Sequence, residues 1–260
     1  MTMTTVKTSR AGQFQGDREA FQMSPRKTAL VAGVLYLLTF VSIPTLFLYV
    51  PVHDPNYILG PGPDTAVLFG GILEVIVALA GVGTAVVLFP VLKRQNEAIA
   101  LGFVGSRVLE GAGILSGVAC LLAIVSLRQA GAGAAALVTG QTLAILYDRI
   151  FLQGGSFMPA ICDLLIGILL YQSRLVPRGL ALIGIVGAPI LLASYLAVMF
   201  GLLGQHAPLA ALSALPVALF EFSLGVYLIV KGFKPSPILS SDTRYASAAA
   251  AFTPSASRRP

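Results

Sequence analysis

Residues 98–127 read AIALGFVGSRVLEGAGILSGVACLLAIVSL, an apolar run of membrane-spanning length that carries Arg107 and Glu110 near its middle. Opposite charges three residues apart lie on one face of a helix. A charged side chain at the centre of a bilayer costs about 3 kcal/mol on insertion scales. The pair therefore predicts that other helices bring polar partners to this point, and that the chain is a helical bundle across a lipid bilayer.

The composition also indicates a membrane protein. Of the 260 residues, 56% are hydrophobic and only 11% are charged, which is far from the average of soluble domains. The net charge of +6 comes from Lys and Arg that mostly flank the apolar runs, as in the cytoplasmic loops of membrane proteins. We therefore expect the lipid bilayer, and no nucleic acid, as the partner of this charge.

Six apolar runs are candidate membrane spans. In chain order they are 28–50, 65–92, 98–127, 156–171, 179–203 and 209–230. The fourth run is short, so its helix either begins at Ser156 or includes part of the preceding segment. That segment, 137–153, carries Asp148 and Arg149, which favours an extra interfacial helix at the outer surface. The predicted fold class is an all-α bundle of six transmembrane helices with this extra helix before the fourth.

Lys and Arg set the predicted orientation. With both termini cytoplasmic, all of the seventeen Lys and Arg lie on the cytoplasmic side except Arg107, Arg128 and Arg149. The reversed orientation inverts this bias. We therefore predict a multi-pass protein of the plasma or inner membrane. Its transmembrane domain, 27–234, lies between cytoplasmic tails at 1–26 and 235–260 that are expected to be disordered.

Four acidic residues fall inside predicted spans, namely Glu74, Glu110, Asp163 and Glu221. At about 1.5 Å per helical residue, Glu74, Glu110 and Glu221 are expected close to the midplane. The same count places Asp163 nearer the outer surface, which favours a solvated or interfacial role for it. Each acid lies on a stripe of small residues, and such stripes let membrane helices pack closely. We therefore expect the acids to face the interior of the bundle and to meet Arg107.

One arginine would then face up to four carboxyls. A guanidinium holds one or two carboxylates, and the remaining carboxyls favour a bound proton or cation in a low dielectric. The predicted ligand-binding or proton-binding residues are Arg107, Glu110, Glu74, Glu221 and Asp163. The leading hypothesis is a carrier for protons, cations or a small amine.

Two alternatives stay open. In the first, the chain is a non-catalytic scaffold or sensor, and the ion pairs only hold helices together. In the second, it is a lipid-modifying enzyme with a site at the outer helix ends, near His53 and Asp163.

The sequence contains none of the common catalytic or cofactor motifs. There is no G-x-S-x-G, no H-E-x-x-H, no P-loop and no dinucleotide fingerprint. His53 and His206 lie in separate predicted loops, and Cys120 and Cys162 lie in separate apolar runs, where they are expected to pack as small apolar side chains. We therefore predict no metal, no cofactor and no catalytic residue.

Four short blocks carry a resemblance to a known family. They are Lys27-Thr-Ala-x-x-Ala32-Gly33-x-x-Tyr36-Leu37, Arg107-x-x-Glu110, Tyr171-x-Ser173-Arg174-x-x-Pro177-Arg178, and Glu221 followed by Lys231-Gly232-Phe233. In this order and spacing they resemble the bacterial multi-pass family catalogued as domain of unknown function 4386, over roughly residues 27–233. Tyr227 and Gly179 depart from the family's pattern. The resemblance implies a polytopic helical membrane protein and no particular activity.

Overall fold

The computed structural model describes residues 23–61, 63–205 and 207–239. These residues form helices and connecting turns, with no strand among them. Six of the helical segments are long and apolar enough to cross a membrane, which confirms the predicted all-α bundle. The residues 1–22 and 240–260 of the predicted tails, and the histidine at position 206, lie outside the described residues.

The helices follow one another with short connections. The first span contains α2 (Pro25–Leu38), η1 (Thr39–Ser42) and α3 (Thr45–Leu48), and the loop after it, predicted to be on the outer side, contains η2 (Val50–His53) and η3 (Tyr57–Leu59). The next two spans are α4 (Thr65–Leu92) and α5 (Glu97–Gln129). The fourth consists of η4 (Gly133–Ala136), α6 (Leu137–Leu152), η5 (Gln153–Phe157) and α7 (Met158–Ser173). The last two are α8 (Arg178–Met199) and α9 (Pro208–Val230).

The first span is broken just before Pro44. Pro44 has no N–H to continue the helix, and η1 separates α2 from α3 before it. Three hydroxyls bond carbonyls in this break: Thr39 donates to the Tyr36 carbonyl at 2.7 Å, Ser42 to Thr39 at 3.1 Å, and Thr45 to Ser42 at 2.6 Å. The side chains of the break therefore satisfy backbone groups that a bilayer leaves without water.

The fourth span differs from the sequence-based expectation. The segment 137–153 does not form a separate interfacial helix, because α6 passes through the π-helical turn η5 directly into α7. Together they form one apolar helix, Gly133–Ser173, of 41 residues. Gly154 and Gly155 lie inside the π-helical turn. Asp148 and Arg149 suggested an interface because the sequence does not reveal that the helix extends so far outward.

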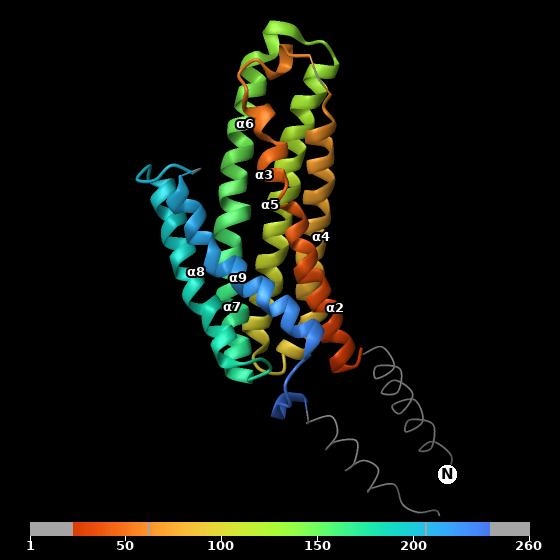
Figure 1. Ribbon diagram of the computed structural model, residues 1–260, viewed down its shortest axis with the longest axis vertical. Coiled ribbons are helices and arrows are strands. Elements are labelled where there is room, and N and C mark those ends of the chain that lie inside the picture. The colour runs from red at the N-terminus through yellow and green to blue at the C-terminus, as the bar shows by residue number, and fades with distance from the viewer. Residues whose placement is uncertain (1–22, 62, 206, 240–260) are drawn as a thin grey trace, which may run out of the picture.

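The spans differ strongly in length. α8 and α9, with 22 and 23 residues, are about 33 to 35 Å long, which matches a hydrocarbon layer of about 30 Å. α5, with 33 residues, is about 50 Å long. In Figure 1, α8 and α9 flank only the lower part of the bundle, whereas α4, α5 and α6 continue beyond them. A bilayer matched to α8 and α9 therefore leaves the far ends of the longer helices outside it.

The described residues form three apolar clusters: a first and a second large one toward opposite ends of the bundle, and a small third one of Ala160, Ala188, Leu191 and Val217 between α7, α8 and α9. Phe103, Leu169 and Phe220 belong to the first, and Ile124 and Tyr147 belong to the second. On α5, the charged residues Arg107 and Glu110 come between Phe103 and the apolar residues of the second core. The packing therefore isolates a polar layer between two apolar ones.

The start of α2 and the end of α9 lie together at one end of the bundle (Figure 1). Arg26 joins them, since its guanidinium donates to the backbone carbonyls of Leu228 at 3.1 Å and Ile229 at 2.7 Å. These carbonyls belong to the last turn of α9, where the intrahelical N–H partners run out; the Leu228 carbonyl also accepts from the backbone N–H of Gly232 at 3.2 Å. An even number of crossings is the reason why both ends of the described chain meet on the same side.

Candidate ligand site at the centre of the bundle

Arg107 is the centre of the polar layer. Its side chain is 2% exposed, and Nη1 donates to both carboxylate oxygens of Glu110, at 3.0 and 3.2 Å. Nη2 donates to Glu221 Oε1 on α9. The rings of Tyr36 and Phe103 lie 5.5 and 5.8 Å from the guanidinium carbon, within reach of a cation–π interaction. The predicted meeting of Arg107, Glu110 and Glu221 is therefore confirmed.

Asp163 also belongs to this cluster, and its predicted position was wrong. Its carboxyl is fully buried, with Oδ1 3.9 Å from Arg107 Nη2. The expectation placed it near the outer surface because depth was counted from Ser156, where the fourth span was expected to begin. The helix begins far earlier, at Gly133, so Asp163 lies about 15 Å from its inner end at Ser173.

Glu74 lies further out along the bundle than the other acids. It is about 27 Å from the inner end of α4 at Leu92, whereas Arg107 is about 15 Å from the start of α5. The expected depth of Glu74 near the midplane stays a prediction; in a bilayer matched to α8 and α9, Glu74 would lie toward the end of the bundle where α4 begins. Glu74 is 5% exposed and accepts a hydrogen bond from the Tyr147 hydroxyl at 3.2 Å.

A cavity of about 260 Å³ joins the two levels. Its walls include Arg107, Glu110, Glu221 and Glu74, so these four side chains share one space although Glu74 makes no ion pair with Arg107. Thr39, Ser42 and Thr45 of the broken first span also line it, and the rest of the wall is largely apolar. Asp163 does not line this cavity.

The small residues beside the acids have the predicted effect. On α4, Gly70, Ala78, Gly81 and Ala85 are all buried together with Glu74. On α9 the stripe is only partly covered, since Ala214, Ala218 and Glu221 are half-buried. The half-buried part of this stripe lines the cavity, which explains why close packing is absent there.

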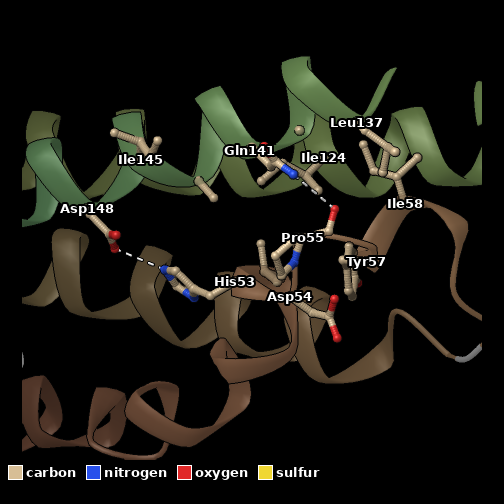
Figure 2. Close-up of a pocket in the computed structure, with 13 residues that line it drawn as sticks. His53, Asp54, Pro55, Tyr57, Ile58, Ile124, Leu137, Gln141, Ile145 and Asp148 are labelled. Carbon is tan, nitrogen blue, oxygen red and sulfur yellow. Dashed lines mark hydrogen bonds and ion pairs between the residues drawn. The ribbon is translucent and has the colours of Figure 1, made fainter. Parts of the chain in front are cut away.

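A second cavity, of about 230 Å³, lies in the outer part of the molecule between η2, η3 and α6. Figure 2 shows His53 and Asp148 joined at one end of this cavity, with Nε2 3.0 Å from Oδ1. The hydrogen bond to the Asp148 carboxylate raises the pKa of His53; burial acts against this, and the Tyr49 carbonyl adds to it. His53 thus pairs with Asp148 and not with Asp163, so the site expected for a lipid-modifying enzyme is not assembled.

The described residues offer no group of three or more His, Cys, Asp and Glu side chains placed to hold a metal ion. Cys162 is buried and its Sγ lies 3.4 Å from Glu110 Oε2, to which it donates. Cys120 is buried in the outer apolar core. The chemistry of the central cavity therefore rests on carboxyls, one guanidinium and hydroxyls.

Comparison with protein families gives one assignment. Residues 31–232 match the family described as "Domain of unknown function (DUF4386)". The chain belongs to this family. Comparison with curated proteins and with solved structures found no match. In this DUF4386 chain the matched region begins within α2 and ends just after α9, so it includes every residue of the central cluster.

Three contacts of the site have no counterpart in the sequence analysis. Tyr147 bonds Glu74, Cys162 bonds Glu110, and Tyr36 covers the guanidinium of Arg107. A signal for Tyr36 was available, since it stands in the first block of the family resemblance. Tyr147 carries no such signal, because its contact requires α6 to pack along α5 so that the hydroxyl reaches Glu74 of α4.

Proposed function

We propose that this membrane protein is a carrier that binds a small organic cation, such as an amine, in the cavity between Glu74, Glu110 and Glu221. The observation that carries the proposal is the charge of this cavity. Three carboxyls line it, and the one basic side chain on its wall, Arg107, is already engaged by two of them. A cationic ligand supplies the positive charge that such a space favours.

The position of the cavity also supports an amphiphilic ligand. Ile43 and Leu46 of the broken first span line the cavity and are 53% and 64% exposed. The cavity therefore opens on the side of the bundle. This surface faces the hydrocarbon in a bilayer matched to α8 and α9. A ligand with an apolar body and a charged nitrogen can enter from the lipid and place the nitrogen beside the carboxyls.

The test is a binding measurement with a cation that has no proton to lose. We expect benzyltrimethylammonium to bind the purified protein in detergent, as measured by isothermal titration calorimetry. Replacing Glu221 or Glu74 by Gln keeps the shape and removes one charge. Two opposite unit charges about 5 Å apart attract by about 3 kcal/mol at an effective dielectric constant of about 20. After screening by solvent, each variant should bind about 10 to 100 times more weakly.

Glu97→Gln is the matched control, because Glu97 is exposed at the start of α5 and far from the cavity. Its affinity should equal that of the parent protein. Equal affinities for Glu74→Gln, Glu221→Gln and Glu97→Gln would contradict a site in this cavity. Uptake of the same cation into proteoliposomes would then distinguish a carrier from a protein that only binds.

A scaffold in which the cluster has a structural role is the second candidate. It is favoured by Arg107, which ties α5 to α9 and is almost completely buried. A scaffold predicts loss of thermal stability in Arg107→Leu and no saturable binding of organic cations by the parent protein.

A further inference from the structure

Asp163 is the one acid of the central cluster that the proposed binding site does not use. Its side chain is fully buried, and neither carboxyl oxygen receives a hydrogen bond from any described residue. Its only ion-pair neighbour, Arg107 Nη2, is 3.9 Å away and donates to Glu221 instead. An ionised carboxylate without donors is very unfavourable in a low dielectric, so the neutral acid is the form that fits these surroundings.

The carboxyls around Arg107 fall into two groups. Glu110 and Glu221 bond the guanidinium and line the cavity, where a ligand reaches them. Asp163 lies 3.9 Å from Nη2 of the same guanidinium but does not line the cavity. Nη2 therefore has two acceptors within reach, and a small rotation of the side chain exchanges Glu221 for Asp163.

We propose that Asp163 holds the exchangeable proton of this carrier, and that Arg107 links the proton to the ligand. In the empty state Arg107 pairs with Glu110 and Glu221 while Asp163 is protonated. When an organic cation binds the two glutamates, Arg107 moves from Glu221 toward Asp163. This movement opens a path for water from the cavity to Asp163, and the proton of Asp163 leaves with that water. This proposal rests on the proposed function and adds its coupling ion.

The exchange leaves the charge of the buried cluster unchanged. Before binding, one guanidinium and two glutamates give a net charge of about −1 with Asp163 neutral. After binding, one more carboxylate and one more cation cancel each other. A low-dielectric interior penalises any net gain of charge, which is the physical reason for a ratio of about one proton per cation.

The charged and titratable side chains around Asp163 come from α2, α5, α7 and α9. α5 contributes Arg107 and Glu110, α9 contributes Glu221, and α2 contributes Tyr36. On α7 itself, Cys162 is adjacent and bonds Glu110. The titratable residues of α8 lie near its two ends: Arg178 stacks on Tyr171, and Tyr195 packs on Phe157. No described side chain other than Arg107 therefore brings a positive charge to Asp163.

The proton is tested first without ligand. Infrared spectroscopy of the purified protein at neutral pH should show a protonated carboxylic acid that disappears in Asp163→Asn and persists in the control Glu97→Gln. Asn has nearly the shape of the neutral acid and should preserve the fold, which circular dichroism checks. A spectrum identical in the parent protein and Asp163→Asn would overturn the proposal, because Asp163 would then be ionised.

The coupling is tested with benzyltrimethylammonium, which carries no proton of its own. Calorimetry in two buffers of different ionisation enthalpy counts released protons, and we expect about one per bound cation for the parent protein and none for Asp163→Asn, which still binds. The infrared band of the parent protein should also vanish on binding, a measurement that needs no variant. Binding without proton release overturns the coupling alone. No binding, with the band present in the empty protein, overturns the proposed function and the exchange together.

Discussion

His53 connects the outer loop to α6 through two hydrogen bonds. One ring nitrogen lies 2.9 Å from the Tyr49 carbonyl and the other 3.0 Å from the Asp148 carboxylate. A neutral imidazole has one N–H and satisfies only one of these acceptors, whereas the protonated ring donates to both. The Asp148 carboxylate accordingly raises the pKa of His53 above its ordinary value of 6.5.

The raised pKa predicts how stability depends on pH. The stabilisation of the folded state by the His53–Asp148 pair is fully present below pH 6.5, the ordinary pKa of histidine. It is lost as the pH rises through the higher pKa that His53 has in the folded state. We expect the parent protein to exceed Asp148→Asn in thermal stability in acid and to lose this advantage in alkali, as measured by thermal unfolding in detergent. The difference should stay below about 1 kcal/mol, because both side chains are partly exposed. Parallel pH profiles for the two proteins would count against the pair, and Glu97→Gln should follow the parent protein.

At the scale of single residues, chemistry was easier to predict than depth. Arg107 and Glu110 predict one another from their spacing, and the need for partners at the bilayer centre predicts Glu221. Asp163 was misplaced along its helix because its depth depends on where the fourth span begins, which is Gly133 and not Ser156. Composition does not mark this point, since the residues before Ser156 remain largely apolar.

Among the helices, the packing of α2 against α9 depends on backbone contact. A Cβ atom on Gly33 would lie 2.7 Å from the Gly225 carbonyl oxygen and 2.8 Å from Ile229. Since neither helix backbone can retreat without moving as a whole, this contact requires glycine. The two helices also carry the break and the stripe that line the central cavity, so their spacing sets its width.

Gly33→Ala should therefore destabilise the protein by about 1 to 3 kcal/mol, the usual cost of overpacking a tight contact. The measurement is thermal or denaturant unfolding in detergent. Gly105→Ala on α5 is the matched control, because a Cβ atom there meets nothing within 4 Å. That change should be neutral or slightly stabilising, since Ala favours a helix by up to about 1 kcal/mol over Gly. Equal stability of the two variants would exclude the contact as a determinant of packing.

Most helix boundaries were predictable, and the exception has a physical reason. Pro44, and the Lys93–Arg94 turn, end helices through effects that act locally along the chain. The π-helical turn Gln153–Phe157 does not follow from local preference. Its Gly154 lies against Gly113 of α5, with a built Cβ of Gly113 only 3.3 Å from the Gly154 Cα, so a contact between distant residues accompanies the irregular turn. Gly154 and Gly155 are compatible with an irregular turn, but the sequence does not reveal that α5 packs against them and fixes it.

The whole molecule has two chemically different ends. Basic residues gather at the end where α2 begins and α9 finishes, among them Arg26, Lys93, Arg174 and Lys231. At the opposite end, Asp64 holds Arg128 at 3.0 Å and accepts from the Tyr57 hydroxyl at 2.8 Å, so the basic charge there is compensated. This asymmetry is the basis for proposing a plasma or inner membrane protein with both ends of the described chain in the cytoplasm.

Cysteine labelling on intact cells tests this orientation. Asn56 lies exposed in the outer loop, and Lys93 lies exposed between α4 and α5. A membrane-impermeant maleimide should label Asn56→Cys before permeabilisation and Lys93→Cys only after it. The parent protein is the control for background, because its native cysteines Cys120 and Cys162 are buried. The opposite labelling order would show that the protein has the reversed orientation. It would also place the compensated end and the His53 pair in the cytoplasm, where their pH would no longer follow the medium.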